Sequence, residues 1–166
     1  MPARGQWLRL GLLIAAATAG LDQASKLWLV MLSPVAAGGR MPVGPFADLV
    51  YQRNPGISYS LFEMRGTAGQ LLLAGFALLV CVGIAIWLTR THDRLTAVSL
   101  GLIMGGALGN AVDRLLYGGV VDFVSLHAAG FYWYVFNLAD VAIVAGVIGL
   151  MYESLIGSRK KDTKGA

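Results

Sequence analysis

Charged residues are scarce in this 166-residue sequence: Asp, Glu, Lys and Arg make up 13% of it, whereas 57% is hydrophobic. A soluble domain carries roughly a quarter charged residues. The mean hydropathy of +0.67 agrees with this deficit. The sequence therefore indicates one modest domain embedded in a membrane. Its net charge of +4 is small and scattered, which does not favour a nucleic-acid partner.

Cysteine is almost absent, and this absence limits the chemistry available. Cys81 is the single cysteine and lies inside the apolar run LLLAGFALLVCVGIAIWL, so it has no partner for an internal disulfide. We interpret it as a small apolar packing residue. The spacings typical of metal ligands do not occur in the sequence, and neither a metal nor another cofactor is expected.

Long apolar runs are what the sequence has instead. A spanning helix needs about 20 mostly apolar residues, and the runs at about 68–88, 96–116 and 138–156 satisfy this length. A fourth run, at about 8–30, is interrupted near its far end by two ionisable residues. We expect an α-helical membrane protein with four transmembrane helices.

Basic residues predict the orientation of these spans. Both termini are predicted to be cytoplasmic, because cytoplasmic segments are enriched in Lys and Arg. Segments 31–66 and 117–137 then lie outside. Eight of the 13 basic residues fall on the predicted cytoplasmic side, and these are Arg4, Arg9, Arg90, Arg94, Arg159, Lys160, Lys161 and Lys164.

The N-terminus also resembles a secretory signal sequence. Two arginines and an apolar core precede Ala17-Thr18-Ala19, which has the small residues of a cleavage site. Cleavage there would leave the remaining topology unchanged. We favour a retained first helix, because apolar sequence resumes at LWLVML (27–32).

The predicted outer segments are not apolar enough to span. Prolines and glycines in 31–66 disfavour long helices, while FADLVYQ (46–52) and ISYSLF (57–62) have the composition of short strands. We expect a small extracytoplasmic β element on the outer membrane face. Residues 123–137 are expected to form a loop. Its aromatic cluster FYWYVF (131–136) is typical of an interfacial belt, and substrate contact is the alternative.

Polar side chains gather near the outer ends of the predicted spans, whereas the middles are nearly free of charge. A charge inside a span costs roughly 2.5–3.5 kcal/mol on insertion scales, so its retention needs an explanation. This set consists of Asp22, Lys26, Asn110, Asp113, Arg114, Asp122, Asn137 and Asp140.

Several of these residues have a structural explanation. Asp22 and Lys26 are four residues apart and can pair on one helix face. Around Asn110, a packed helix end with Asp113 paired to Arg114 is one reading, and a substrate carbonyl bound by Arg114 is the other. A repeat of small residues precedes this helix end and permits the close approach of another helix; it comprises Gly101, Gly105 and Gly109.

Asp122 and Asp140 suggest chemistry when they are taken together. Asn137 and Asp140 have the spacing of a capping box, and a carboxylate suits the positive end of a helix. Asp122 lies in the strand-like stretch GGVVDFVSL with no basic residue between it and the next helix. If 123–137 returns to the same side, the two aspartates can meet. One protonated and one ionised carboxylate can polarise a scissile carbonyl and activate water.

Two other functions also fit these residues. A proton-coupled transporter uses intramembrane acids, but it predicts acids spread through the depth of the bilayer. A non-catalytic assembly protein would use the glycine repeat as its main feature, with the acids acting as caps and ion pairs. From the residues alone, these two and the protease rank almost level.

Short blocks of the sequence resemble the signature motifs of the bacterial lipoprotein signal peptidases, also called signal peptidase II. The resemblance implies a four-helix intramembrane aspartic endopeptidase of the bacterial inner membrane, with its active site near the outer face. Its partners would be membrane lipids and diacylglyceryl-modified prolipoproteins, which it cleaves just before the lipidated cysteine. In the order of the family, the blocks are DQASK (22–26), NPG (54–56), GGALGNAVDR (105–114), GGVVDF (118–123) and FNLAD (136–140).

The resemblance also assigns roles within the site. It implies that Asp122 and Asp140 form the catalytic pair, and that Asn54 and Arg114 hold the substrate backbone. Gly56, in the outer-loop block NPG that also contains Asn54, is implied as a supporting residue. The remaining residues would order the site or support it structurally, and they are Asn110, Asp113, Asn137, Asp22 and Lys26.

One block departs from the family pattern. The outer-loop motif of the family usually reads N-x-G-A-A-F, whereas Ile57, Ser58 and Tyr59 follow the glycine here. The fit of the substrate at this loop is therefore not predicted. His92 is expected on the cytoplasmic side, and His127 is expected to be a surface residue of the outer loop. The sequence does not predict an oligomeric state.

Overall fold

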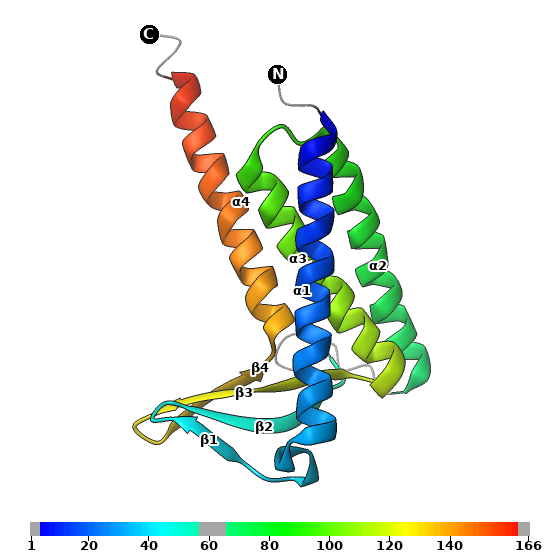
Figure 1. Cartoon of the computed structure of the whole chain (residues 1–166), viewed down its shortest axis with the longest axis vertical. Coiled ribbons are helices and arrows are strands. Elements are labelled where there is room, and N and C mark those ends of the chain that lie inside the picture. The colour runs from blue at the N-terminus through cyan, green and yellow to red at the C-terminus, as the bar shows by residue number, and fades with distance from the viewer. Residues whose placement is uncertain (1–3, 57–65, 163–166) are drawn as a thin grey trace.

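The computed structural model describes residues 4–56 and 66–162, which form a helical bundle with one small sheet at its end (Figure 1). The helices of the described chain are α1 (Arg4–Leu32), the short 3-10 helix η1 (Pro34–Ala37), α2 (Thr67–Arg90), α3 (Arg94–Tyr117) and α4 (Leu138–Asp162). The strands are β1 (Met41–Gly44), β2 (Ala47–Asn54), β3 (Val120–Ala128) and β4 (Phe131–Phe136).

Within residues 4–56 and 66–162, three helices are long and apolar enough to cross a membrane, namely α2, α3 and the part of α4 up to Leu155. These three agree with the predicted runs at 68–88, 96–116 and 138–156. The fourth predicted run, 8–30, lies within α1, which is a continuous helix of 29 residues. By composition α1 is not among the candidate spans, so its crossing of the membrane stays a prediction.

Helix α3 is the centre of the bundle, because the other three helices each pack more extensively against it than against one another. Glycine makes this possible on two faces. A Cβ atom at Gly105 would lie 2.5 Å from the carbonyl oxygen of Ala15 in α1, and one at Gly106 would lie 2.5 Å from that of Ala139 in α4. The close approach predicted from the glycine repeat is confirmed, with α1 as the partner helix.

The strands form one antiparallel sheet in the order β1-β2-β3-β4. The predicted strand at 46–52 is confirmed as part of β2, whereas the predicted strand at 57–62 lies outside the described residues. The loop predicted over 123–137 is wrong, since these residues form the β3–β4 hairpin, with positive φ at Ala129 and Gly130 in its turn. The β-branched and aromatic residues of both strands favour this pairing.

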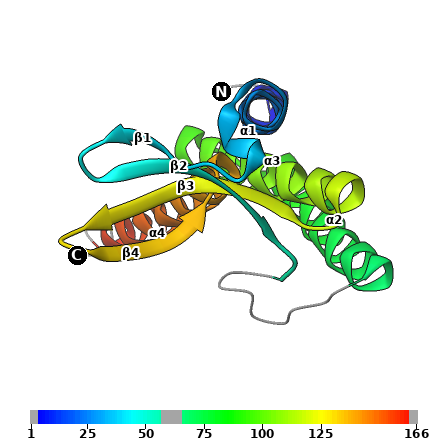
Figure 2. The same cartoon turned by 90° about the horizontal axis from the view of Figure 1, so that it is seen from below.

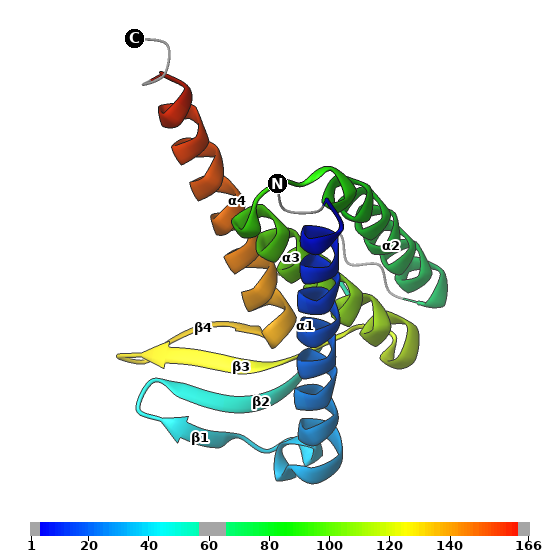
Figure 3. The same ribbon diagram turned by 45° about the horizontal axis from the view of Figure 1, so that its top comes forward.

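The sheet lies at the end of the bundle opposite the link between α2 and α3 (Figures 1 and 3). Figure 2 shows the strands lying across this end, with β3 and β4 passing over α4. Strand β4 leads directly into α4, and α3 leads through Gly118 and Gly119 into β3. The polar residues at the ends of three helices are therefore brought next to the two central strands.

The packing of α1 on α3 can be tested with Gly105→Ala. We expect a loss of about 1–3 kcal/mol in the free energy of unfolding, because the added methyl group meets a rigid backbone carbonyl. The matched control is Gly83→Ala, since a Cβ atom at Gly83 of α2 meets no atom within 4 Å. Thermal unfolding in detergent would measure both variants. Equal unfolding midpoints would contradict the close helix contact.

Candidate functional site

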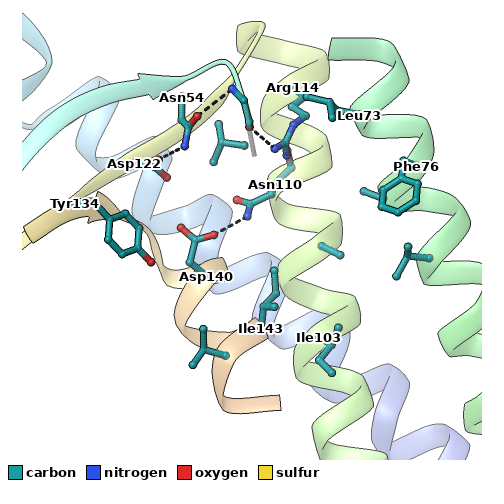
Figure 4. Close-up of a pocket in the computed structure, with 16 residues that line it drawn as sticks. Asn54, Leu73, Phe76, Ile103, Asn110, Arg114, Asp122, Tyr134, Asp140 and Ile143 are labelled. Carbon is teal, nitrogen blue, oxygen red and sulfur yellow. Dashed lines mark hydrogen bonds between the residues drawn. The ribbon is translucent and has the colours of Figure 1, made fainter. Parts of the chain in front are cut away.

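A cavity of about 370 Å³ lies between α2, α3 and α4 at the end of the bundle next to the sheet (Figure 4). Its wall within the bundle is apolar and is formed by Leu73, Phe76, Ala77, Val80, Ile103, Ala107, Ile143 and Val144. Its end beside the sheet is mainly polar and is formed by Asn54, Gly56, Asn110, Arg114, Asp122, Tyr134 and Asp140, with Val120. A cavity divided in this way suits a ligand with an apolar part and a polar part.

Asp122 and Asp140 approach this cavity from different elements. Asp122 lies on β3 and is only 2% exposed, and Asp140 lies in the first turn of α4. Each carboxylate accepts two hydrogen bonds. The Nδ2 groups of Asn137 and Asn54 donate to Asp122 at 2.7 and 3.2 Å. Asp140 accepts from Asn110 Nδ2 at 3.0 Å and from the backbone N–H of Asn137 at 3.2 Å.

Asn137 is the residue that joins the two carboxylates. Its side chain donates to Asp122, and its backbone N–H donates to Asp140. Its Oδ1 atom accepts the backbone N–H of Asp140 at 3.0 Å, which confirms the predicted capping box at the start of α4. The local capping interaction therefore also places one aspartate beside the other.

The surroundings of Asp122 change its protonation. Burial raises the pKa of this carboxyl group from 3.8 to about 7, and the negative charge of Asp140 acts in the same direction. Hydrogen bonds from Asn54 and Asn137, and the positive charge of Lys26, partly oppose the rise in this pKa. Asp122 is therefore able to exchange a proton near neutral pH, as a general acid or base requires.

The segment from Asn54 to Gly56 forms one edge of the cavity and is held at several points. Gly56 donates its backbone N–H to Asn54 Oδ1 at 3.0 Å, and Arg114 Nη2 donates to the carbonyl oxygen of Gly56 at 3.0 Å. Gln70 Nε2 donates to the carbonyl oxygen of Pro55 at 2.7 Å. These contacts fix the amide of Asn54 that reaches Asp122.

Arg114 does not pair with Asp113. Adjacent residues of a helix point in different directions, and Arg114 turns toward the carbonyl groups of Gly56 and Asn110. Its Nε atom is buried and has no hydrogen-bond partner within the described residues. The predicted pair of Asp113 with Arg114 is therefore wrong, and the binding of a substrate carbonyl by Arg114 stays a prediction.

Asp113 faces α1 instead, where it takes part in a buried cluster. Lys26 Nζ lies 2.7 Å from Asp22 Oδ2 and 2.7 Å from Asp113 Oδ2. The predicted Asp22–Lys26 pair is therefore confirmed, but it has a third charged member. Lys26 Nζ also donates to Asn110 Oδ1 at 3.1 Å, so the cluster touches the polar end of the cavity.

Two glutamines were not identified from the sequence. Gln23 Nε2 donates to the carbonyl oxygen of Gly109 at 3.0 Å and to Asp113 Oδ1 at 2.8 Å. Gln70 holds the carbonyl group of Pro55, as described above. The available signals were the position of Gln70 inside the apolar run at 68–88 and the position of Gln23 inside the motif DQASK.

His127 lies in β3 rather than in a loop, and it is part of a separate polar cluster. Its Nε2 atom lies 3.3 Å from Asp48 Oδ2, and Arg40 Nη1 lies 2.5 Å from the same oxygen. The hydrogen bond from Arg40 holds the pKa of Asp48 below its usual value. These residues do not line the cavity. Within the described residues, no group of His, Cys, Asp and Glu side chains is arranged to hold a metal ion.

The fold and the cavity define a class of protein: a membrane helical bundle whose apolar cavity ends at two carboxylates. The chain belongs to the signal peptidase II family, whose model, described as Signal peptidase (SPase) II, matches residues 14–156. Membership makes it a bacterial membrane protein of a hydrolase family that processes lipoproteins.

Similar proteins agree with this assignment. The chain is 51% identical over 155 residues to a lipoprotein signal peptidase of Rhodopseudomonas palustris (strain TIE-1). The matched region covers 91% of this chain and 94% of the relative. It is 52% identical over 147 residues to a lipoprotein signal peptidase of Methylorubrum extorquens (strain PA1). This match covers 89% of this chain and 86% of the relative.

Solved structures share the fold. One is a bacterial membrane enzyme determined by the in meso method, with a TM-score of 0.79 and 25% identity, covering 91% of this chain and 90% of that one. A second bacterial membrane enzyme determined by the same method has a TM-score of 0.74 and 26% identity. The match covers 87% of this chain and 92% of that one.

The bridging role of Asn137 can be tested with Asn137→Asp. This change keeps an oxygen that caps α4, but it turns a second oxygen toward Asp122 Oδ1 in place of the donor now 2.7 Å away. We expect a loss of about 1–3 kcal/mol in the free energy of unfolding at pH 8. The loss should shrink toward pH 5, because protonation of either of the two facing carboxyl groups, at position 137 or at Asp122, restores a hydrogen-bond donor between them.

Thermal unfolding at both pH values would measure this effect. Gln6→Glu is the matched control, since it makes the same amide-to-carboxylate change at an exposed position of α1. A stability loss of Asn137→Asp that did not depend on pH would contradict the contact with Asp122.

Proposed function

We propose that this protein is an intramembrane aspartic endopeptidase that cleaves diacylglyceryl-modified prolipoproteins just before the lipidated cysteine. Membership of the signal peptidase II family supports the removal of signal peptides from prolipoproteins. The observation that carries the finer proposal is the position of Asp122 and Asp140. Both line the polar end of an apolar cavity, and both are bonded to Asn137.

In the proposed reaction the two carboxyl groups share one proton. Asp140 lies in the first turn of α4, where the helix dipole favours a negative charge, so we assign it the ionised state. Asp122 is buried and its pKa is raised to about 7, so we assign it the proton. This division supplies one base and one acid at neutral pH.

The chemical steps follow from this division. Asp140 takes a proton from a water molecule, whose oxygen attacks the carbonyl carbon of the scissile peptide bond. Asp122 donates its proton to the carbonyl oxygen, which gives a neutral tetrahedral diol. The proton held by Asp140 then passes to the departing amine, and Asp122 recovers its proton from the diol as the new carboxyl group forms. The reaction needs only the two carboxylates and water.

The remainder of the cavity supports the proposed substrate. The apolar wall formed by α2, α3 and α4 offers a surface for acyl chains and for the apolar part of a signal peptide. Arg114 and Asn54 lie at the polar end, where we assign them to the substrate backbone.

The proposed membrane arrangement has four spans at about 8–30, 68–88, 96–116 and 138–156, in the bacterial inner membrane. The start of α1, the α2–α3 link and the end of α4 lie at one end of the bundle, and the sheet lies at the other (Figure 1). With both termini cytoplasmic, segments 31–66 and 117–137 and the carboxylate pair lie at the outer face. The lipidated end of a substrate would lie at the same depth.

The roles of the aspartates can be tested by Asp122→Asn and Asp140→Asn. We expect each change to lower the rate of cleavage of a diacylglyceryl-modified prolipoprotein by at least about a hundredfold, because each removes one proton-transfer group. Gel analysis of the purified, folded variants would measure cleavage. The matched control is Asp48→Asn, a buried aspartate of the same sheet that does not line the cavity, and it should stay active. Full activity of either dyad variant would remove the mechanism.

The shared proton predicts a bell-shaped dependence of kcat/KM on pH. Asp122 has a raised pKa of about 7, so its proton is present below this pH and is lost as the pH rises through it, which lowers the rate. At acidic pH the second carboxylate also takes up a proton, and no base remains. Initial rates from about pH 4 to 10 would define both limbs. A rate that stayed constant above pH 7 would contradict the assignment of the acid to Asp122.

A further inference from the structure

We infer that Lys26 is the positioning residue of the site, in that its ammonium group sets the relative position of Asp122 and Asp140. This inference rests on the proposed function, since it concerns the same carboxylate pair. Lys26 does not line the cavity, so it acts through other residues. Only 1% of its side chain is exposed, and its helix, α1, contributes no residue to the lining of the cavity.

The ammonium group has three N–H donors, and three acceptors surround it. The partners are Asp22 Oδ2 at 2.7 Å, Asp113 Oδ2 at 2.7 Å and Asn110 Oδ1 at 3.1 Å. Both carboxylates are completely buried, and the ammonium group lies against both, which offsets part of the cost of burying their charge. Lys26 thus holds together one residue of its own helix and two residues of α3.

Each carboxylate partner of Lys26 holds the backbone next to one member of the pair. Asp22 Oδ1 accepts the backbone N–H of Ala139 at 3.0 Å, one residue before Asp140. Asp113 Oδ2 accepts the backbone N–H of Val121 at 3.0 Å, one residue before Asp122. The start of α4 and strand β3 are therefore tied to the same ammonium group, each through one aspartate.

The third partner reaches the pair directly. Asn110 Oδ1 accepts from Lys26 and from Asn137 Nδ2, the latter at 3.2 Å. Because an ammonium group can only donate, the oxygen of this amide must face Lys26, and its nitrogen must face away. That nitrogen donates to Asp140 Oδ1 at 3.0 Å, so Lys26 also fixes the donor that faces Asp140.

A positioning role predicts a specific kinetic effect. A displacement of about 1 Å in a reacting group can cost about a hundredfold in rate, whereas the cavity wall that binds substrate does not involve Lys26. Loss of the ammonium group should therefore lower kcat by about a hundredfold and leave KM within about threefold of its original value.

Lys26→Met alone leaves two buried carboxylates without a cation and can fail to fold for that reason. The decisive variant is therefore the triple change Lys26→Met, Asp22→Asn and Asp113→Asn. It leaves no unpaired charge, and each asparagine keeps an oxygen for the N–H of Ala139 or Val121. Both variants would be purified in detergent and assayed with a diacylglyceryl-modified prolipoprotein, with unfolding midpoints measured in parallel.

We expect the triple variant to fold and to lose kcat with KM retained. The control Arg40→Met also removes a cation from an ion pair, but on the sheet and away from the cavity, so it should keep both constants. A folded triple variant with unchanged kcat would overturn the inference. Failure of the triple variant to fold would also overturn it, because the network would then be needed for folding of the bundle and not for position.

Asp122→Asn and Asp140→Asn, assayed in the same series, separate the two proposals. If these dyad variants are inactive while the triple variant is fully active, only the role of Lys26 is wrong. If the dyad variants remain active, the proposed function itself is wrong, whatever the result for Lys26.

Discussion

The interaction on which the site depends is the buried contact of the Lys26 ammonium group with Asp22 and Asp113. Burial of charges is expensive, and the shared cation compensates part of the charge of the two carboxylates. Here the compensation also has a geometric result. Asp22 Oδ1 accepts a hydrogen bond from the backbone of α4, and Asp113 Oδ2, which Lys26 also contacts, accepts one from the backbone of β3. One buried cation therefore connects α1, α3, α4 and the sheet.

Close helix packing is the condition that brings these groups within reach. Gly109 lies against the side chain of Asp22, where a Cβ atom would come within 2.5 Å of Oδ2. Gly106 gives α4 the same closeness on the other face of α3, at the carbonyl group of Ala139. Without these glycines the helices would separate, and side chains as short as Asp and Asn would no longer bridge them. The small residues of α3 therefore serve the polar network as well as helix association.

Features that depend on local spacing could be predicted from the sequence. The pairing of Asp22 with Lys26 follows from a separation of four residues, and the capping box of Asn137 and Asp140 follows from a separation of three. Features that depend on distant segments could not. The choice of Lys26 over Arg114 as the partner of Asp113 requires the position of α1, and the β3–β4 hairpin is stabilised by pairing with β2.

The sequence by itself determined that this chain is a membrane helical bundle with a set of polar residues at one level, because hydropathy and short-range periodicity are properties of neighbouring residues. It also determined the family, through motifs that can be read in order along the chain. Only the tertiary structure decided which polar groups meet. Hydrogen bonds between residues 15 to 117 positions apart, such as those from Asn137 to Asp122 and from Ala139 to Asp22, form only when packing brings their elements together.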